Sequence, residues 1–125
     1  LRTYYIDTYS ACKMKVEPTI ASPSLLVLSP GEKSQEELIA DVAHGLFVTA
    51  FNGGNCNSST GDFSYGIEGF LIEQGRLTQP VSEMVVTGNM LDLWQQLVAV
   101  GNDPRLESNW RIPTLTFEGI NASGC

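Results

Sequence analysis

The sequence predicts an α+β fold with an antiparallel or mixed β-sheet that could be barrel-like, a long hairpin and two helices. Residues 62–73 and 76–87 are two long β-prone runs on either side of a Gln-Gly pair. A helix start signal lies at Ser34, and a helical apolar stripe begins at Met90. The length of 125 residues suits one domain.

The first quarter of the chain is predicted to be mostly extended. Residues 1–10 alternate apolar and polar types, which indicates a strand, whereas residues 11–24 hold two prolines and no clean period, which indicates a loop. Residues 24–28 form a short apolar run typical of a buried strand. The chain begins with neither a start methionine nor a signal peptide, so we expect residues 1–125 to be a fragment of a longer chain.

The first helix has a capping-box start, since Glu37 follows Ser34 at the spacing at which each side chain bonds the other's backbone N–H. Gly45 is the predicted stop, in a left-handed conformation. A short strand is expected over residues 46–51. Apolar residues at helical spacing mark the buried face: Leu38, Ile39, Val42 and Leu46.

The hairpin is the clearest element. Its two-residue Gln74-Gly75 loop fits a type I′ turn. Gly66 and Gly69 indicate a bulge or a close approach by another backbone, and Pro80 indicates an edge or a bulge. Period two places four apolar residues of the first strand on one face, Phe63, Tyr65, Ile67 and Leu71, and two on the other, Phe70 and Ile72.

The second helix is expected to open at Asn89 and to end at Gly101. A polar connector follows over residues 102–113, then a last strand over residues 113–118 and a small polar tail. The apolar stripe of this helix comprises Met90, Leu91, Trp94, Leu97 and Val98.

Composition excludes several function classes. The 14 acidic against 7 basic residues give a net charge of −7, and because nucleic-acid affinity depends on neutralising phosphates, no direct nucleic-acid binding is expected. No apolar run is long enough to span a bilayer, so no membrane partner is expected. The three cysteines, Cys12, Cys56 and Cys125, are widely spaced and odd in number, which argues against a disulfide framework. Free thiols suit a reducing compartment, and a cytoplasmic location is expected.

The single histidine, His44, limits the chemistry. A zinc-protease helix needs two histidines at i and i+4, and a zinc site needs at least three protein ligands. We therefore expect no catalytic residue and no metal ligand in this chain. His44 is expected near the end of the first helix, where a positive side chain suits the helix dipole. A hydrolase using Cys56 or Ser64 is the least favoured alternative, because neither has a visible base.

A polar loop and the hairpin edge form the expected contact surface for a peptide or a partner. Residues 52–61 are too polar to build a core, and their glycines allow positive φ. Extended peptides add readily to exposed sheet edges. Turn capping by Asp62 and simple exposure of Glu68 are the structural alternatives. The expected contact residues are Asn52, Gly53, Gly54, Thr60, Gly61, Asp62, Ser64 and Glu68.

Residues 60–75 read Thr-Gly-Asp-Phe-Ser-Tyr-Gly-Ile-Glu-Gly-Phe-Leu-Ile-Glu-Gln-Gly. This run strongly resembles the C-terminal domain of the TldD/PmbA family, whose members are also labelled modulators of DNA gyrase. Residues 98–103 (Val-Ala-Val-Gly-Asn-Asp) and 8–11 (Thr-Tyr-Ser-Ala) are similar to family motifs, with Cys12 where arginine is usual. The resemblance covers nearly the whole chain.

The resemblance implies two kinds of subunit. The TldD type is a zinc metallopeptidase with two metal histidines in a preceding domain and a cysteine ligand between the Gly-Asn-Asp segment and the last strand. The PmbA (TldE) type lacks this set and pairs with the TldD type. The corresponding connector here, residues 104–113, has no cysteine. The chain is therefore identified as PmbA/TldE-like, with no cofactor of its own and with zinc in a TldD-type partner.

The function implied is that of the C-terminal domain of the non-catalytic subunit of a heteromeric zinc metalloprotease acting on peptides or unfolded proteins. A TldD-type subunit and a peptide substrate are the expected partners. The alternative is a stand-alone peptide- or protein-binding module without a proteolytic role.

Overall fold

The computed structural model describes residues 6–19 and 25–124 and confirms the α+β class. In chain order, the elements of this described part are α1 (Thr8–Met14), β1 (Leu26–Val27), α2 (Gln35–Ala40), β2 (His44–Cys56), β3 (Asp62–Glu73), β4 (Arg76–Asn89), α3 (Met90–Gln95), β5 (Leu97–Val100), β6 (Trp110–Arg111), β7 (Leu115–Phe117) and β8 (Asn121–Ser123). No helix of the described part is long and apolar enough to cross a membrane.

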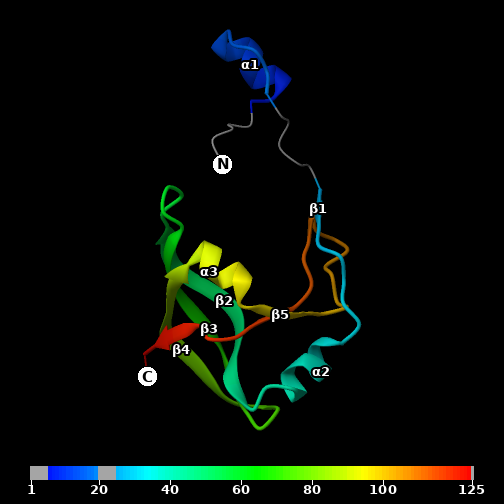
Figure 1. Cartoon of the computed structure of the whole chain (residues 1–125), viewed down its shortest axis with the longest axis vertical. Coiled ribbons are helices and arrows are strands. Elements are labelled where there is room, and N and C mark those ends of the chain that lie inside the picture. The colour runs from blue at the N-terminus through cyan, green and yellow to red at the C-terminus, as the bar shows by residue number, and fades with distance from the viewer. Residues whose placement is uncertain (1–5, 20–24, 125) are drawn as a thin grey trace.

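The main sheet has four antiparallel strands in the order β2-β3-β4-β8. Two small ribbons accompany it: β1 pairs with β6 in parallel, and β5 pairs with β7 antiparallel. Figure 1 shows the long curved strands on one side of the molecule, α2 and the β1 ribbon on the other, and α1 standing apart from both. Within the described residues β2 and β8 do not pair, so the sheet stays open and no barrel closes.

The hairpin is confirmed, with β4 two residues longer than predicted. Gln74 and Gly75 have φ of 50° and 74°, as a type I′ turn requires. Their backbone N–H groups donate to the carbonyls of Ala43 (2.6 Å) and Val42 (2.8 Å). The turn is thereby tied to the segment that joins α2 to β2.

The glycines of β3 allow the neighbouring strand to approach closely, as predicted. A Cβ at Gly69 would overlap the carbonyl oxygen of Phe47, and a Cβ at Gly66 would overlap the side-chain oxygen of Asn52. The prediction that Pro80 lies on an edge or at a bulge is confirmed. Strand β8 pairs only with residues 85–87 of β4, which leaves Pro80 on an edge of the sheet. Nearby, Glu83 has φ of 60° beside a register shift between β3 and β4.

The core within residues 6–19 and 25–124 includes Ala11, Leu38, Phe63, Ile67 and Ile72, all of which are buried. The predicted alternation of buried and exposed side chains breaks down near the C-terminal end of β3, where the pairing with β4 shifts between Phe70 and Ile72. After that shift Ile72 is buried and Leu71 half-buried, while Phe70 is 37% exposed. A β-bulge changes which side of the strand faces the core, and this change lies outside what a simple alternation can predict.

The first helix begins as predicted, because both hydrogen bonds of the Ser34–Glu37 capping box are present. Its predicted end at Gly45 is wrong. The helix stops at Ala40 with Asp41 as its C-cap, and Gly45 lies in β2. The two bonds from the hairpin turn to Val42 and Ala43 hold this segment outside the helix. Strand β2 therefore begins earlier, at His44, than the predicted residue 46.

The prediction for the N-terminal segment is largely wrong where it can be compared. Residues 1–5 of the predicted strand lie outside the described residues, and α1 occupies Thr8–Met14 in place of the expected strand end and loop start. Asp7 caps this helix by accepting from the backbone N–H of Ser10 at 2.6 Å, and Lys15 ends it with φ of 55°. The cap outweighs the short alternating pattern. Of the buried strand predicted over residues 24–28, Leu26–Val27 is observed as a strand, and Ser24 lies outside the described residues. The predicted burial is wrong, because Leu26 and Val27 are both exposed.

Two further boundaries differ from the prediction. The polar loop is shorter, because residues 52–56 continue β2 and pair with β3 after a register shift. The second helix opens at Asn89 as predicted but stops at Gln95, and Leu97–Val100 is strand β5 on β7. Leu97 and Val98 therefore belong to no helical stripe.

The C-terminal region holds more strand than predicted. The expected last strand is present as β7, shortened to Leu115–Phe117. The connector contains β6, and the polar tail contains β8, which pairs with residues 85–87 of β4. Such two- and three-residue strands depend on a partner far away in sequence, so no local pattern indicates them.

Candidate functional site

Strands β2 and β3 and the turn between them carry the polar residues that the sequence singles out. Asn52, Gly53 and Gly54 lie on the outer strand β2, and Asp62, Ser64 and Glu68 lie on β3 beside them. Thr60 and Gly61 lie in the turn between the two strands. The Asn52 side-chain amide donates to the Glu68 carboxylate at 3.2 Å, so this exposed charge has a partner. These residues extend from the middle of β2 and β3 to the turn that joins the two strands.

The turn is held by hydrogen bonds that centre on Asn89. Its side-chain amide donates to the Thr60 carbonyl and to the Asp62 carboxylate, both at 2.9 Å. Its side-chain oxygen accepts from the backbone N–H of Leu91 at 3.0 Å and so caps α3. The Met90 N–H adds a bond to the Gly61 carbonyl at 2.8 Å. Asn89 therefore fixes the turn between β2 and β3 to the start of α3.

Asp62 is a turn-capping residue, as its structural alternative states. The Asn89 amide and, second, the Thr60 hydroxyl at 2.8 Å donate to its carboxylate. These bonds stabilise the ionised form and hold the pKa of Asp62 below its ordinary value of 3.8. The carboxylate stays exposed and charged at neutral pH.

Replacing Asn89 should loosen the turn between β2 and β3 and change the pKa of Asp62. We expect Asn89→Ala to lower the unfolding free energy by about 1–2 kcal/mol, because it removes an N-cap and two further bonds. The same change should raise the pKa of Asp62 toward its ordinary value, measured by NMR titration of the side-chain carboxyl. Asn55→Ala, at an exposed position of β2, is the control. An unchanged Asp62 titration in Asn89→Ala would contradict this role.

A second group of polar side chains holds the start of the connector. Asp103 accepts from the Thr114 backbone N–H at 3.0 Å and from its hydroxyl at 2.7 Å. Gln35, at the start of α2, donates to the Thr114 hydroxyl at 2.8 Å. The Gly101 N–H donates to the Thr114 carbonyl at 2.7 Å. The Val-Ala-Val-Gly-Asn-Asp segment thus joins three parts of the chain that lie far apart in sequence.

This group predicts a dependence of stability on acid. Burial pushes the pKa of Asp103 up, but the bonds from the Thr114 hydroxyl and backbone outweigh burial and lower the pKa below 3.8. A carboxyl with a lowered pKa in the folded state stabilises the fold above about pH 4 and loses this contribution as the pH falls through its folded pKa. The unfolding free energy should therefore fall less steeply below pH 4 in Asp103→Asn than in the wild type. Asp7 and Asp62 also have lowered pKa values, but both residues are present in both proteins, so their contributions to the pH dependence cancel in the comparison. Equal slopes would contradict the role of Asp103.

Among the described residues, Cys12 lies on α1, and His44 and Cys56 lie at opposite ends of β2. His44 is exposed at the start of β2, so its predicted place at a helix end is wrong. Cys12 is exposed on α1, and Cys56 is half-buried with its thiol 3.9 Å from the Gly61 carbonyl oxygen. Across residues 6–19 and 25–124, no three His, Cys, Asp or Glu side chains are grouped so that they could hold a metal ion. This donor set does not fit zinc, which needs at least three fixed protein ligands.

These features define a class: an open-sheet α+β domain whose polar tip is built from hydrogen-bonded side chains, without a metal-ligating group in its described part. The family model of the PmbA/TldA metallopeptidase C-terminal domain matches residues 1–124, and the chain belongs to this family. The Escherichia coli O157:H7 protein named metalloprotease PmbA is 41% identical over 127 residues, covering 99% of this chain and 28% of that protein.

Solved structures agree with the family. A Bacteroides thetaiotaomicron protein, described as a candidate modulator of DNA gyrase, matches with a TM-score of 0.85 and 66% identity, over 100% of this chain and 29% of that one. TldE from Thermococcus kodakarensis matches with a TM-score of 0.75 over 94% of this chain and 30% of that one. At 24% identity, the TldE match bears on the fold alone. The chain thus spans less than a third of the length of these relatives.

Proposed function

We propose that the chain is the C-terminal domain of a PmbA/TldE-like, non-catalytic subunit of a heteromeric zinc metalloprotease that acts on peptides or unfolded proteins. The observation that carries the proposal is the connector, residues 104–113, which holds no cysteine where the TldD type has its ligand. The Asp103–Thr114 bonds and the pairing of β6 with β1 hold this segment at both ends.

The proposed role in peptide contact rests on the outer strand. Among the described residues, β2 is an edge of the main sheet along all 13 of its residues. An extended peptide can pair with such an edge through its backbone, without regard to sequence. Phe51, 66% exposed and 5.6 Å from the Tyr65 ring between centroids, adds an apolar contact next to Asn52. The proposed contact residues remain Asn52, Gly53, Gly54, Thr60, Gly61, Asp62, Ser64 and Glu68.

The proposed partner is a TldD-type subunit, which would supply the zinc, in the cytoplasm. The test is to co-express the full-length polypeptide with a TldD-type subunit from the same organism. We expect the two to co-purify and a peptidase activity that requires both. Absence of a complex together with absence of joint activity would contradict the proposal. Peptide binding that persists without any TldD-type subunit would favour the stand-alone binding module instead.

A further inference from the structure

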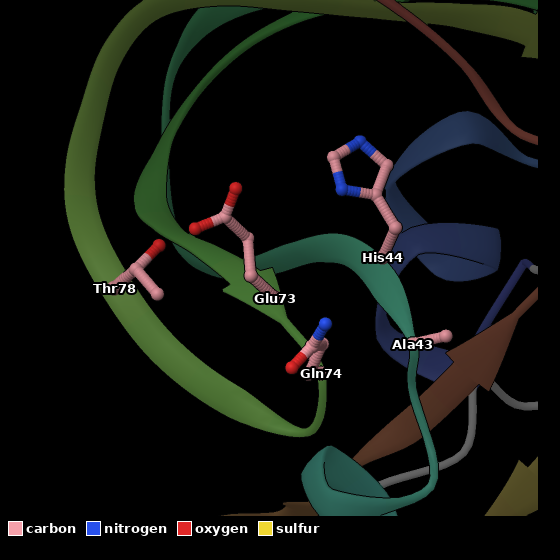
Figure 2. Close-up of a pocket in the computed structure, with 5 residues that line it drawn as sticks. All are labelled: Ala43, His44, Glu73, Gln74 and Thr78. Atoms are coloured by element: carbon pink, nitrogen blue, oxygen red, sulfur yellow. The ribbon is translucent and has the colours of Figure 1, made fainter.

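A hollow of about 520 Å³ lies beside the Gln74-Gly75 turn of the β3–β4 hairpin, at the opposite end of β4 from Asn89. Figure 2 shows the side chains of His44, Glu73 and Thr78 directed into the space that the curved strands surround. The lining residues are Ala43, His44, Glu73, Gln74 and Thr78. Neither the family comparison nor the proposed peptide edge assigns a role to this hollow.

The floor of the hollow is fixed by the backbone. The hairpin turn donates its two N–H groups to Ala43 and Val42, at 2.6 Å and 2.8 Å. A Cβ at Gly75 would come within 2.6 Å of the Ala40 carbonyl oxygen, so the turn is pressed against the end of α2. His44 and Glu73 are direct cross-strand partners, which puts their side chains on the same face of the sheet. The backbone that carries these polar side chains is thus held in place.

Two of the lining side chains, Glu73 and Thr78, offer hydrogen-bond acceptors. The Thr78 hydroxyl donates to the Leu71 carbonyl at 3.3 Å, which leaves its oxygen lone pairs for a ligand. The Glu73 carboxylate accepts only, and it is the one acidic group among the lining residues. Arg76 is its partner in register, but within residues 6–19 and 25–124 the one ion pair is Lys33–Asp41. The Glu73 charge is therefore available to a ligand.

We propose that this hollow binds a primary ammonium group, with the Glu73 carboxylate as its counter-charge and the Thr78 hydroxyl oxygen as a further acceptor. A compact ammonium with three donors matches several acceptors gathered around one space. The group can come from the amino terminus of a peptide or from a lysine side chain. The inference does not depend on the proposed proteolytic role, since it rests on the lining residues alone.

The test is an NMR titration of the ¹⁵N-labelled full chain with three probes. Trialanine amide carries only an N-terminal ammonium, N-acetyl-lysine methylamide carries only a side-chain ammonium, and N-acetyl-trialanine amide carries neither. We expect saturable shifts at Glu73, Gln74 and Thr78 with at least one ammonium probe and none with the blocked peptide. The probe that binds more tightly identifies the source of the group.

Three variants give the inference its controls. Glu73→Gln keeps the shape of the side chain and should weaken binding about tenfold or more, because it removes a charged hydrogen bond. Arg76→Gln removes a competing cation and should bind at least as tightly as the wild type. Glu118→Gln, an exposed acid away from the hollow, should leave the affinity unchanged. No saturable shifts with either ammonium probe, unchanged affinity in Glu73→Gln, or weaker binding in Arg76→Gln would each overturn the assignment.

Discussion

Gly54→Ala is expected to lower the unfolding free energy of the chain by about 3 kcal/mol or more. Gly54 has φ of 118°, a conformation that side chains other than glycine rarely adopt. An added Cβ would overlap the Ser64 carbonyl oxygen and lie 2.6 Å from the Tyr65 Cα, both backbone atoms of β3. Neither atom can move without separating the two strands. Chemical denaturation measures the effect.

Gly53→Ala is the matched control for this change. Gly53 has a similar φ of 137°, but an added Cβ would meet nothing within 4 Å. It should therefore cost only the backbone strain, about 1–2 kcal/mol. The difference between the two variants isolates the contact of β2 with β3. Equal costs would show that residues 52–56 are the loose loop tip that the sequence suggests, and not a paired strand.

Ile67→Ala is expected to cost about 3 kcal/mol. Ile67 lies in the middle of β3 and is only 1% exposed, the most deeply buried of the large apolar side chains described. Truncation leaves a cavity on the buried face of β3. The register shifts of β3 with both β2 and β4 limit how far the sheet can relax to fill this cavity. Ile67→Val removes one methylene and should cost about 1 kcal/mol.

Val98→Ala provides the contrast for Ile67, because Val98 is 52% exposed on β5. Its cost should stay within about 0.5 kcal/mol, as for most surface substitutions. A ranking in which Val98→Ala costs as much as Ile67→Ala would contradict the placement of the core beneath β3. Denaturant midpoints at a common slope give the ranking directly.

The elements that the sequence predicts correctly are those with local causes. The Ser34–Glu37 capping box and the Gln74-Gly75 turn each depend on side chains or dihedrals within four residues, and both are present. The failures have distant causes. Leu97–Val100 follows an apolar helical stripe, yet it pairs with β7. Gly45 suits a helix end, yet the hairpin turn bonds to the chain before it and the helix is already over.

The candidate site follows the same division. The sequence locates the polar residues of the hairpin because their composition is unusual for a strand. The sequence does not reveal that Asn89 fixes the turn between β2 and β3, because the partners of Asn89, Thr60 and Asp62, lie 29 and 27 positions earlier. The Gly-Asn pair before an apolar helical run indicates a helix cap, but no local pattern indicates that the same asparagine also bonds to residues so far away in sequence. Asp103 and Thr114 are likewise joined across the connector, 11 positions apart.

We propose, as the core of the functional assignment, that the polypeptide carrying this domain binds no zinc by itself and depends on a TldD-type subunit for activity. The most direct measurement is the zinc content of the purified full-length polypeptide after chelation, reloading with zinc and removal of the excess. The proposed role predicts no stoichiometric zinc in this polypeptide alone and zinc in its complex with a TldD-type subunit. One tightly bound zinc per polypeptide, in the absence of any partner, would contradict the claim.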